Sequence, residues 1–188
     1  MDFAISVKDV FQLGKDNHPW EKFAMPNGAG HIFVATEFDL GVSDLLHYHD
    51  EPHLSLILNG GVIDKRKNVE NEKVSGGLMF FHAGENHQTI NRIFPNKYMS
   101  LSFNWDFLRQ KSISEAKLDC LITKSPGSKF TLLKIYKELL ANDEFSDASI
   151  EMLLFNLMDK KKIIKNSSPI WIKNVNQFLN DKWNKELS

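Results

Sequence analysis

The sequence contains little of what marks several large protein classes. Its single cysteine, Cys120, excludes an internal disulfide framework and a cysteine-rich zinc module. Six prolines and ten glycines among 188 residues are too few for a fibrous or disordered chain. There is no apolar run of about 18 residues, so we predict no membrane-spanning helix. The net charge of −1 argues against nucleic-acid binding through a general basic surface. A reduced, cytoplasmic globular protein is the expectation that remains.

Glycines and turn signals are concentrated in the first half of the chain. Nine of the ten glycines lie at or before Gly84. Asn59-Gly60-Gly61 is a predicted turn. Around such signals we expect about eight short strands, which are typical of an antiparallel jelly roll. They include 30–38, 54–58, 62–66, 69–74, 78–81, 87–90 and 97–105.

The period of the apolar residues changes after Asp106. In 127–141 and again in 147–162 they recur at the i, i+3, i+4, i+7 spacing of an amphipathic helix. Ser146 and Asp147 are candidate N-cap residues for the second of these helices. A third apolar stripe follows the break at Ser167-Ser168-Pro169. One face of a barrel need not cover all of these stripes, so the helical pair is the expected homodimer contact.

Five of the seven histidines are clustered in the first half, at His47, His49, His53, His82 and His87. His47 and His49 are two residues apart, so on a strand their side chains leave the same face. A bend at 50–52 would let His53 open the next strand, and rolling of the barrel would bring His87 opposite His47 and His49. Three or four converging imidazoles suit one divalent ion, either Zn, Ni or Fe. A polar pocket without metal is the alternative interpretation.

The spacing of these residues resembles the two motifs of the cupin fold. The first is Gly41-x5-His47-x-His49-x3-His53-x6-Gly60, and the second is Gly76-x5-His82-x-Gly84-x2-His87-x3-Asn91. The resemblance implies a double-stranded β-helix (a jelly-roll barrel) followed here by an α-helical segment. It also implies a metal site formed by His47, His49, His53 and His87. His53 stands where the first motif usually has Glu, so the fourth ligand is neutral and offsets none of the charge of the ion.

Longer stretches resemble the sensor domains of AraC/XylS-type transcription regulators. They are 47–61, 82–88, 132–143, 149–151, 169–173 and 175–188, of which the last is similar to the first helix of that family's DNA-binding domain. The resemblance implies a small-molecule effector, a homodimer through the helices, and DNA contact only through helix-turn-helix units expected beyond Ser188. The expected parts are a sensor barrel (1–105), a helical linker and dimerisation segment (106–168) and the first helix of a truncated DNA-binding domain (169–188).

Aromatic side chains are the candidate walls of an effector cavity. The predicted ligand-binding residues are Phe33, His82, Phe80, Phe103 and Trp105. We assign no catalytic residue, and we expect a regulator rather than an enzyme because the C-terminal tail has no use in a stand-alone enzyme. Two other functions remain open. One is a metal-dependent cupin dioxygenase or isomerase that uses the all-histidine site, and the other is a carbohydrate- or small-ligand-binding module without regulation.

Overall fold

The computed structural model describes residues 5–6, 21–37, 46–67 and 69–159. The third helical stripe and the first helix of a DNA-binding domain, both predicted within 160–188, lie outside these residues. The described strands are β1 (Ile5–Ser6), β2 (Glu21–Ala24), β3 (Gly30–Glu37), β4 (His47–Tyr48), β5 (His53–Arg66), β6 (Val69–Val74), β7 (Leu78–Phe81) and β8 (His87–Phe103). The described helices are the short 3-10 helix η1 (Pro26–Gly28), α2 (Trp105–Gln110), α3 (Glu115–Thr123), α4 (Ser128–Ala141) and α5 (Ser146–Met158).

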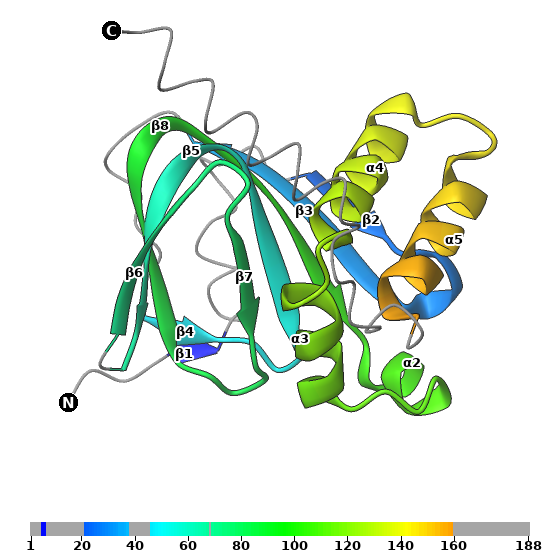
Figure 1. Ribbon diagram of the computed structural model, residues 1–188, viewed down its shortest axis with the longest axis horizontal. Coiled ribbons are helices and arrows are strands. Elements are labelled where there is room, and N and C mark those ends of the chain that lie inside the picture. The colour runs from blue at the N-terminus through cyan, green and yellow to red at the C-terminus, as the bar shows by residue number, and fades with distance from the viewer. Residues whose placement is uncertain (1–4, 7–20, 38–45, 68, 160–188) are drawn as a thin grey trace, which may run out of the picture.

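The eight described strands belong to one sheet that rolls into a barrel, with the helices packed on one side (Figure 1). The longest strand, β8, pairs antiparallel with β3, β4 and β5, and β5 also pairs with β6 and β7. Only the β1–β4 pair is parallel among the described strands. The predicted architecture, a mainly β jelly roll followed by a helical segment, is confirmed. No described helix is both long enough and apolar enough to cross a membrane.

The predicted turn at 59–61 is wrong, because β5 continues through it from His53 to Arg66. Pairing of β5 with β8 shifts register between Ile57 and Val62. Gly60 has a φ of 81°, and a Cβ there would lie 2.3 Å from the carbonyl oxygen of Ile93. Glycine therefore serves a bulge and a close backbone approach instead of a hairpin. In the same way β8 continues from the strand predicted at 87–90 into the one predicted at 97–105, but it ends at Phe103, and Trp105 begins α2.

Alternate residues of the strands divide between two faces of the sheet. The histidine face bears His31, Phe33, His53, Ser55, Met79, Phe81, Ser100 and Ser102, which the strand registers place together. The helix face bears Ile32, Val34, Leu54, Leu56, Phe80, Met99, Leu101 and Phe103. Apolar residues of α2, α3, α4 and α5 cover the helix face and form one continuous core with it. Their packing fixes the helices against the barrel.

The sequence predicts bounds for two helices: α4 matches the one at 127–141 closely, and α5 begins one residue before the one at 147–162 and ends at Met158. No bounds are predicted for α2 and α3. Asn104 caps α2, since its side-chain oxygen accepts from the Asp106 N–H at 2.8 Å. Ser146 and Asp147 are the first residues of α5 and not its caps, and the N-cap position is Phe145, without a side-chain cap bond. The buried residues of α4 are Ser128, Leu132 and Ile135, whereas Leu133 and Leu140 of its predicted stripe are exposed.

Candidate metal centre

Three histidines converge where β4 meets β8. His47 and His87 are register partners on these strands, and their ring centroids are 4.3 Å apart. His49 follows β4 directly, and its ring centroid is 5.0 Å from the centroids of both other rings. Each residue offers one ring nitrogen to a group in which all such atoms lie within 4.8 Å of one another. His47 and His87 are buried, and His49 is half-buried.

His53 lies beside this group, which does not include it. Its ring centroid is 3.6 Å from that of His49 and 5.9 Å from that of His87. Its Nε2 is 3.4 Å from the hydroxyl oxygen of Ser55, which is in turn 2.6 Å from the hydroxyl of Ser100. Among the described residues its buried Nδ1 has no hydrogen-bond partner. His53 thus extends the cluster from three imidazoles toward the hydroxyls of the histidine face.

Burial keeps the imidazoles of His49, His53 and His87 neutral. Burial first, and then the neighbouring histidines, lowers the pKa of His49 far below its usual value, and the pKa of His53 is lowered in the same way. Burial lowers the pKa of His87 to about 4, although its hydrogen bond to Glu85 acts in the opposite direction. Only neutral imidazole can bind a metal. The lone pairs of these rings are therefore available at neutral pH.

The hydrogen bond of His87 decides which of its nitrogens can bind an ion. Its Nδ1 lies 2.9 Å from the main-chain oxygen of Glu85. A carbonyl oxygen only accepts, so Nδ1 carries the proton and Nε2 keeps its lone pair, as in metal-binding histidines generally. The buried Nε2 of His49 has no hydrogen-bond partner within the described part of the chain. An unpartnered buried nitrogen and a fixed tautomer both fit a divalent ion.

The donor spacing sets what a bound ion would require. Nitrogens about 2.1 Å from a tetrahedral zinc ion are about 3.4 Å apart, and the candidate nitrogens lie within 4.8 Å of one another, so the rings need to close by at most about 1.4 Å. His47 and His87 share one strand register, so this closure needs movement of side chains more than of strands. The residues present therefore fit a three-nitrogen site with further coordination positions open to water or a ligand.

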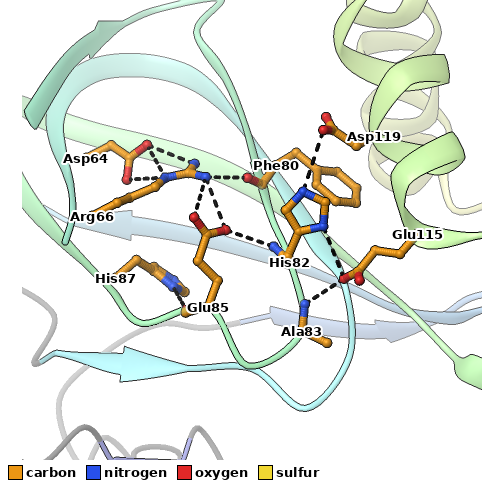
Figure 2. Close-up of polar contacts among 9 residues, drawn as sticks. All are labelled: Asp64, Arg66, Phe80, His82, Ala83, Glu85, His87, Glu115 and Asp119. Carbon is orange, nitrogen blue, oxygen red and sulfur yellow. Dashed lines mark hydrogen bonds and ion pairs between the residues drawn. The ribbon is translucent and has the colours of Figure 1, made fainter. Parts of the chain in front are cut away.

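A charged network lies against the histidines (Figure 2). The ring of Phe81 stacks on His87 with centroids 3.9 Å apart, and the guanidinium of Arg66 lies 4.4 Å from the centroid of the Phe81 ring. Arg66 binds the buried Asp64, with Nη2 2.9 Å from Oδ2, and it binds Glu85, with Nη1 3.2 Å from Oε1. Two carboxylates against one guanidinium leave a net negative charge beside neutral ligands, which favours a cation there.

The aromatic residues predicted to line a cavity do not share one surface. Phe33 lies on the histidine face and is half-buried. Phe80 and Phe103 lie on the helix face, in the core beneath the helices. Trp105 is the first residue of α2, and its Nε1 donates to the main-chain oxygen of Asp50 at 2.9 Å. Strand alternation separates Phe33 from the other two phenylalanines.

An open groove of about 620 Å³ lies between β6, β7 and α3. Two of the predicted ligand-binding residues, Phe80 and His82, line it. The three grouped histidines do not, so the groove and the histidine group are separate surfaces. Arg66 and its partner Asp64 were not among the predicted site residues. Their spacing of two residues on one strand is the signal that could have paired them.

The two histidine motifs meet across β4 and β8 inside a jelly roll whose outer face carries the helices. The fold is a cupin-type barrel. No protein-family model matches the chain, and no curated protein does. Solved cupin structures show low similarity, which assigns neither an activity nor a ligand. They include a cupin superfamily protein from Desulfitobacterium hafniense (16% identity, 47% of this chain and 78% of that chain covered, TM-score 0.42). Two others are a Cupin 2 conserved barrel domain protein from Salinispora arenicola (15%, 52% and 85%, 0.44) and a DMSP lyase from Ruegeria pomeroyi (16%, 49% and 49%, 0.42).

Proposed function

We propose that this chain is the metal-dependent sensor domain of an AraC/XylS-type regulator, in which His47, His49 and His87 hold one Zn, Ni or Fe ion. The observation that carries the metal assignment is the group of three ring nitrogens within 4.8 Å of one another. The unpartnered buried nitrogen of His49 supports it. A bound ion would supply open coordination positions for an oxygen or nitrogen atom of an effector.

The histidine face supports a polar effector. The hydroxyls of Ser55 and Ser100 lie beside His53, and the hydroxyl of Ser102 donates to the Glu51 carboxylate at 2.7 Å. Hydroxyls of this kind orient a ligand through hydrogen bonds. We therefore expect the effector to be a small molecule with oxygen donors, bound to the metal at one end and to hydroxyls at the other.

The engagement of the nearby carboxylates favours sensing over catalysis. Asp64 and Glu85 both bind Arg66, and Glu51 accepts hydrogen bonds from Ser102 and Asn104. A general base needs a free lone pair within reach of the substrate. These three carboxylates already hold protein partners, with which a proton transfer would have to compete, whereas effector binding requires no proton transfer.

The exposed apolar side chains of α4 and α5 support a homodimer. They are Phe130, Leu133, Leu140, Met152 and Phe155, and the adjoining loop adds Phe145. A second copy would remove this surface from water, and dimerisation through the helical segment would place two downstream DNA-binding domains side by side. Effector binding would act by favouring one arrangement of these helices over another.

The second candidate function is a metal-dependent cupin dioxygenase or isomerase. It is favoured by the neutral, all-nitrogen ligand set, which leaves positions open for substrate. One experiment separates the two. Zinc-loaded and Fe(II)-loaded protein is screened for thermal stabilisation by a panel of oxygen-rich small molecules, and the Fe(II) form is assayed for turnover of 1,2-diketones, thiols and flavonols. The sensor predicts stabilisation without turnover. Turnover that His47→Ala abolishes contradicts the sensor and supports the enzyme.

A further inference from the structure

The turn between β7 and β8, residues 82–86, bonds directly to two of the three grouped histidines. The Gly84 N–H donates to the main-chain oxygen of His49 at 2.8 Å. The main-chain oxygen of Glu85 accepts from His87 Nδ1 at 2.9 Å. The position of His49 and the ring orientation of His87 both depend on where this turn lies.

The other side of the turn is bonded to α3 (Figure 2). The Ala83 N–H donates to Oε1 of Glu115, the first residue of that helix, at 2.6 Å. The His82 Nδ1 lies 3.5 Å from the same oxygen, and its Nε2 lies 3.6 Å from Asp119 Oδ2, one helical turn further on. On the helix side, all three of these contacts are made by a carboxylate, either Glu115 or Asp119.

Helix α3 is a firm anchor for these links. Its residues Leu118 and Ile122 are fully buried in the core against the helix face. The tip of the turn is open, since Gly84 and Asn86 are exposed and a Cβ built at Gly84 meets no atom within 4 Å. The second support of the turn is the Glu85 carboxylate, which binds Arg66 of β5. The turn is thus held from the barrel by Arg66 and from the helices by Glu115.

We propose that Glu115 is a positioning residue for the histidine group, and that metal at the histidines and the stability of α3 depend on each other through it. The inference rests on the proposed metal site, and it adds the contacts through which that site would be coupled to α3. A partner that orients a metal-binding histidine through hydrogen bonds raises metal affinity. Coupling between two sites is reciprocal, so a helix that improves metal binding is itself held more firmly when metal is bound.

The first test removes the link in metal-free protein. Hydrogen exchange in 82–86 is compared among wild type, Glu115→Ala, Glu115→Gln and Glu144→Ala. The amide oxygen of Gln still accepts from Ala83, and Glu144 is an exposed loop residue that serves as the charge control. We expect exchange about tenfold faster in Glu115→Ala only. Unchanged exchange in Glu115→Ala overturns the positioning role. Faster exchange in Glu115→Gln, which keeps the acceptor for the Ala83 N–H, also overturns it, so the test remains decisive if Glu115→Ala folds poorly.

The second test adds zinc alone. By chelator competition we expect Glu115→Ala to bind zinc about tenfold more weakly and Glu115→Gln within about twofold of wild type. Zinc should slow hydrogen exchange in 115–123 of wild type but not of Glu115→Ala. Equal zinc affinities, or no response of 115–123 in wild type, overturn the inference. A wild type that binds no zinc contradicts the proposed function and the coupling to metal, while the metal-free exchange still decides whether Glu115 positions the turn.

Discussion

The histidine face and the helix face alternate along the same strands, yet they are built from opposite chemistry. On β8, Ser100 faces the cluster of imidazoles and hydroxyls, while its neighbour Leu101 is fully buried under the helices. The helix face gains its stability from apolar area removed from water. The histidine face keeps buried ring nitrogens that could bind a metal. Two of them, His49 Nε2 and His53 Nδ1, have no hydrogen-bond partner among the described residues. One surface holds the fold together, and the other keeps donors available for a ligand.

The largest contrast is expected between Leu101→Ala and Ser100→Ala. The first leaves a cavity in the core and should lower the free energy of unfolding by about 3 kcal/mol. The second removes one hydrogen bond, to Ser55, and should cost about 1 kcal/mol. Urea unfolding of the two variants measures the difference. Equal losses would show that the two faces contribute to stability alike.

Acid should lower the stability of the metal-free protein, because the buried histidines are protonated more easily in the unfolded chain. The pKa of His87 is lowered to about 4 from 6.5, so between these values the unfolded chain binds a proton that the folded chain does not. The contribution of this residue to the free energy of unfolding is therefore fully present above about pH 6.5. It falls as the pH drops toward 4, by up to about 3 kcal/mol. The measurement is urea unfolding at pH 7, 6, 5 and 4. His87→Gln should remove only the part of this fall that His87 contributes, because the pKa values of His49 and His53 are lowered as well. A profile unchanged by this variant contradicts the assignment.

In the charged network, the guanidinium of Arg66 should offset the cost of burying the charged Asp64 carboxylate. Arg66→Met leaves the buried Asp64 carboxylate without its cation, and we expect a loss of about 2 kcal/mol because the guanidinium is only partly buried. The double variant Asp64→Asn/Arg66→Met removes the charge as well and should recover part of that loss. Thermal unfolding of both variants provides the comparison. A double variant less stable than Arg66→Met contradicts this account.

The smallest effect on the folded monomer should come from the outer surface of the helices. Leu140, which is 65% exposed, can become Lys at a cost below about 0.5 kcal/mol. In the proposed dimer the same change places a charge in an apolar contact, so sedimentation should show a shift from dimer to monomer. Val74→Lys, at an exposed apolar residue of β6, is the matched control. A dimer unaffected by Leu140→Lys places the interface elsewhere.

Much of this comparison was predictable from the sequence. The spacing of His47, His49 and His87 predicts that they meet in a rolled barrel, because alternation along strands determines which side chains share a face. Alternation does not say which face is covered by helices. For that reason the sequence does not reveal that Phe103, a predicted cavity wall, lies in the core against the helices, whereas Phe80 also lines the open groove.

Other features depend on contacts between distant parts of the chain. Gly60 carries a turn signal, but the close approach of Ile93 makes it a bulge. Glu115 has no local pattern that links it to the histidines, since its hydrogen bond to Ala83 joins a helix to a turn 32 residues earlier. Local sequence predicts the strands and helices, and the tertiary packing decides which polar side chains reach the site.

The most direct test is the metal content of purified protein, measured by elemental analysis after equilibration with zinc at pH 7.5. The account predicts one ion per chain in wild type and in His82→Ala, and none in His47→Ala/His87→Ala. Binding should weaken below about pH 6, because protons compete for imidazoles that must be neutral to bind. One ion per chain retained by the double variant would contradict the site.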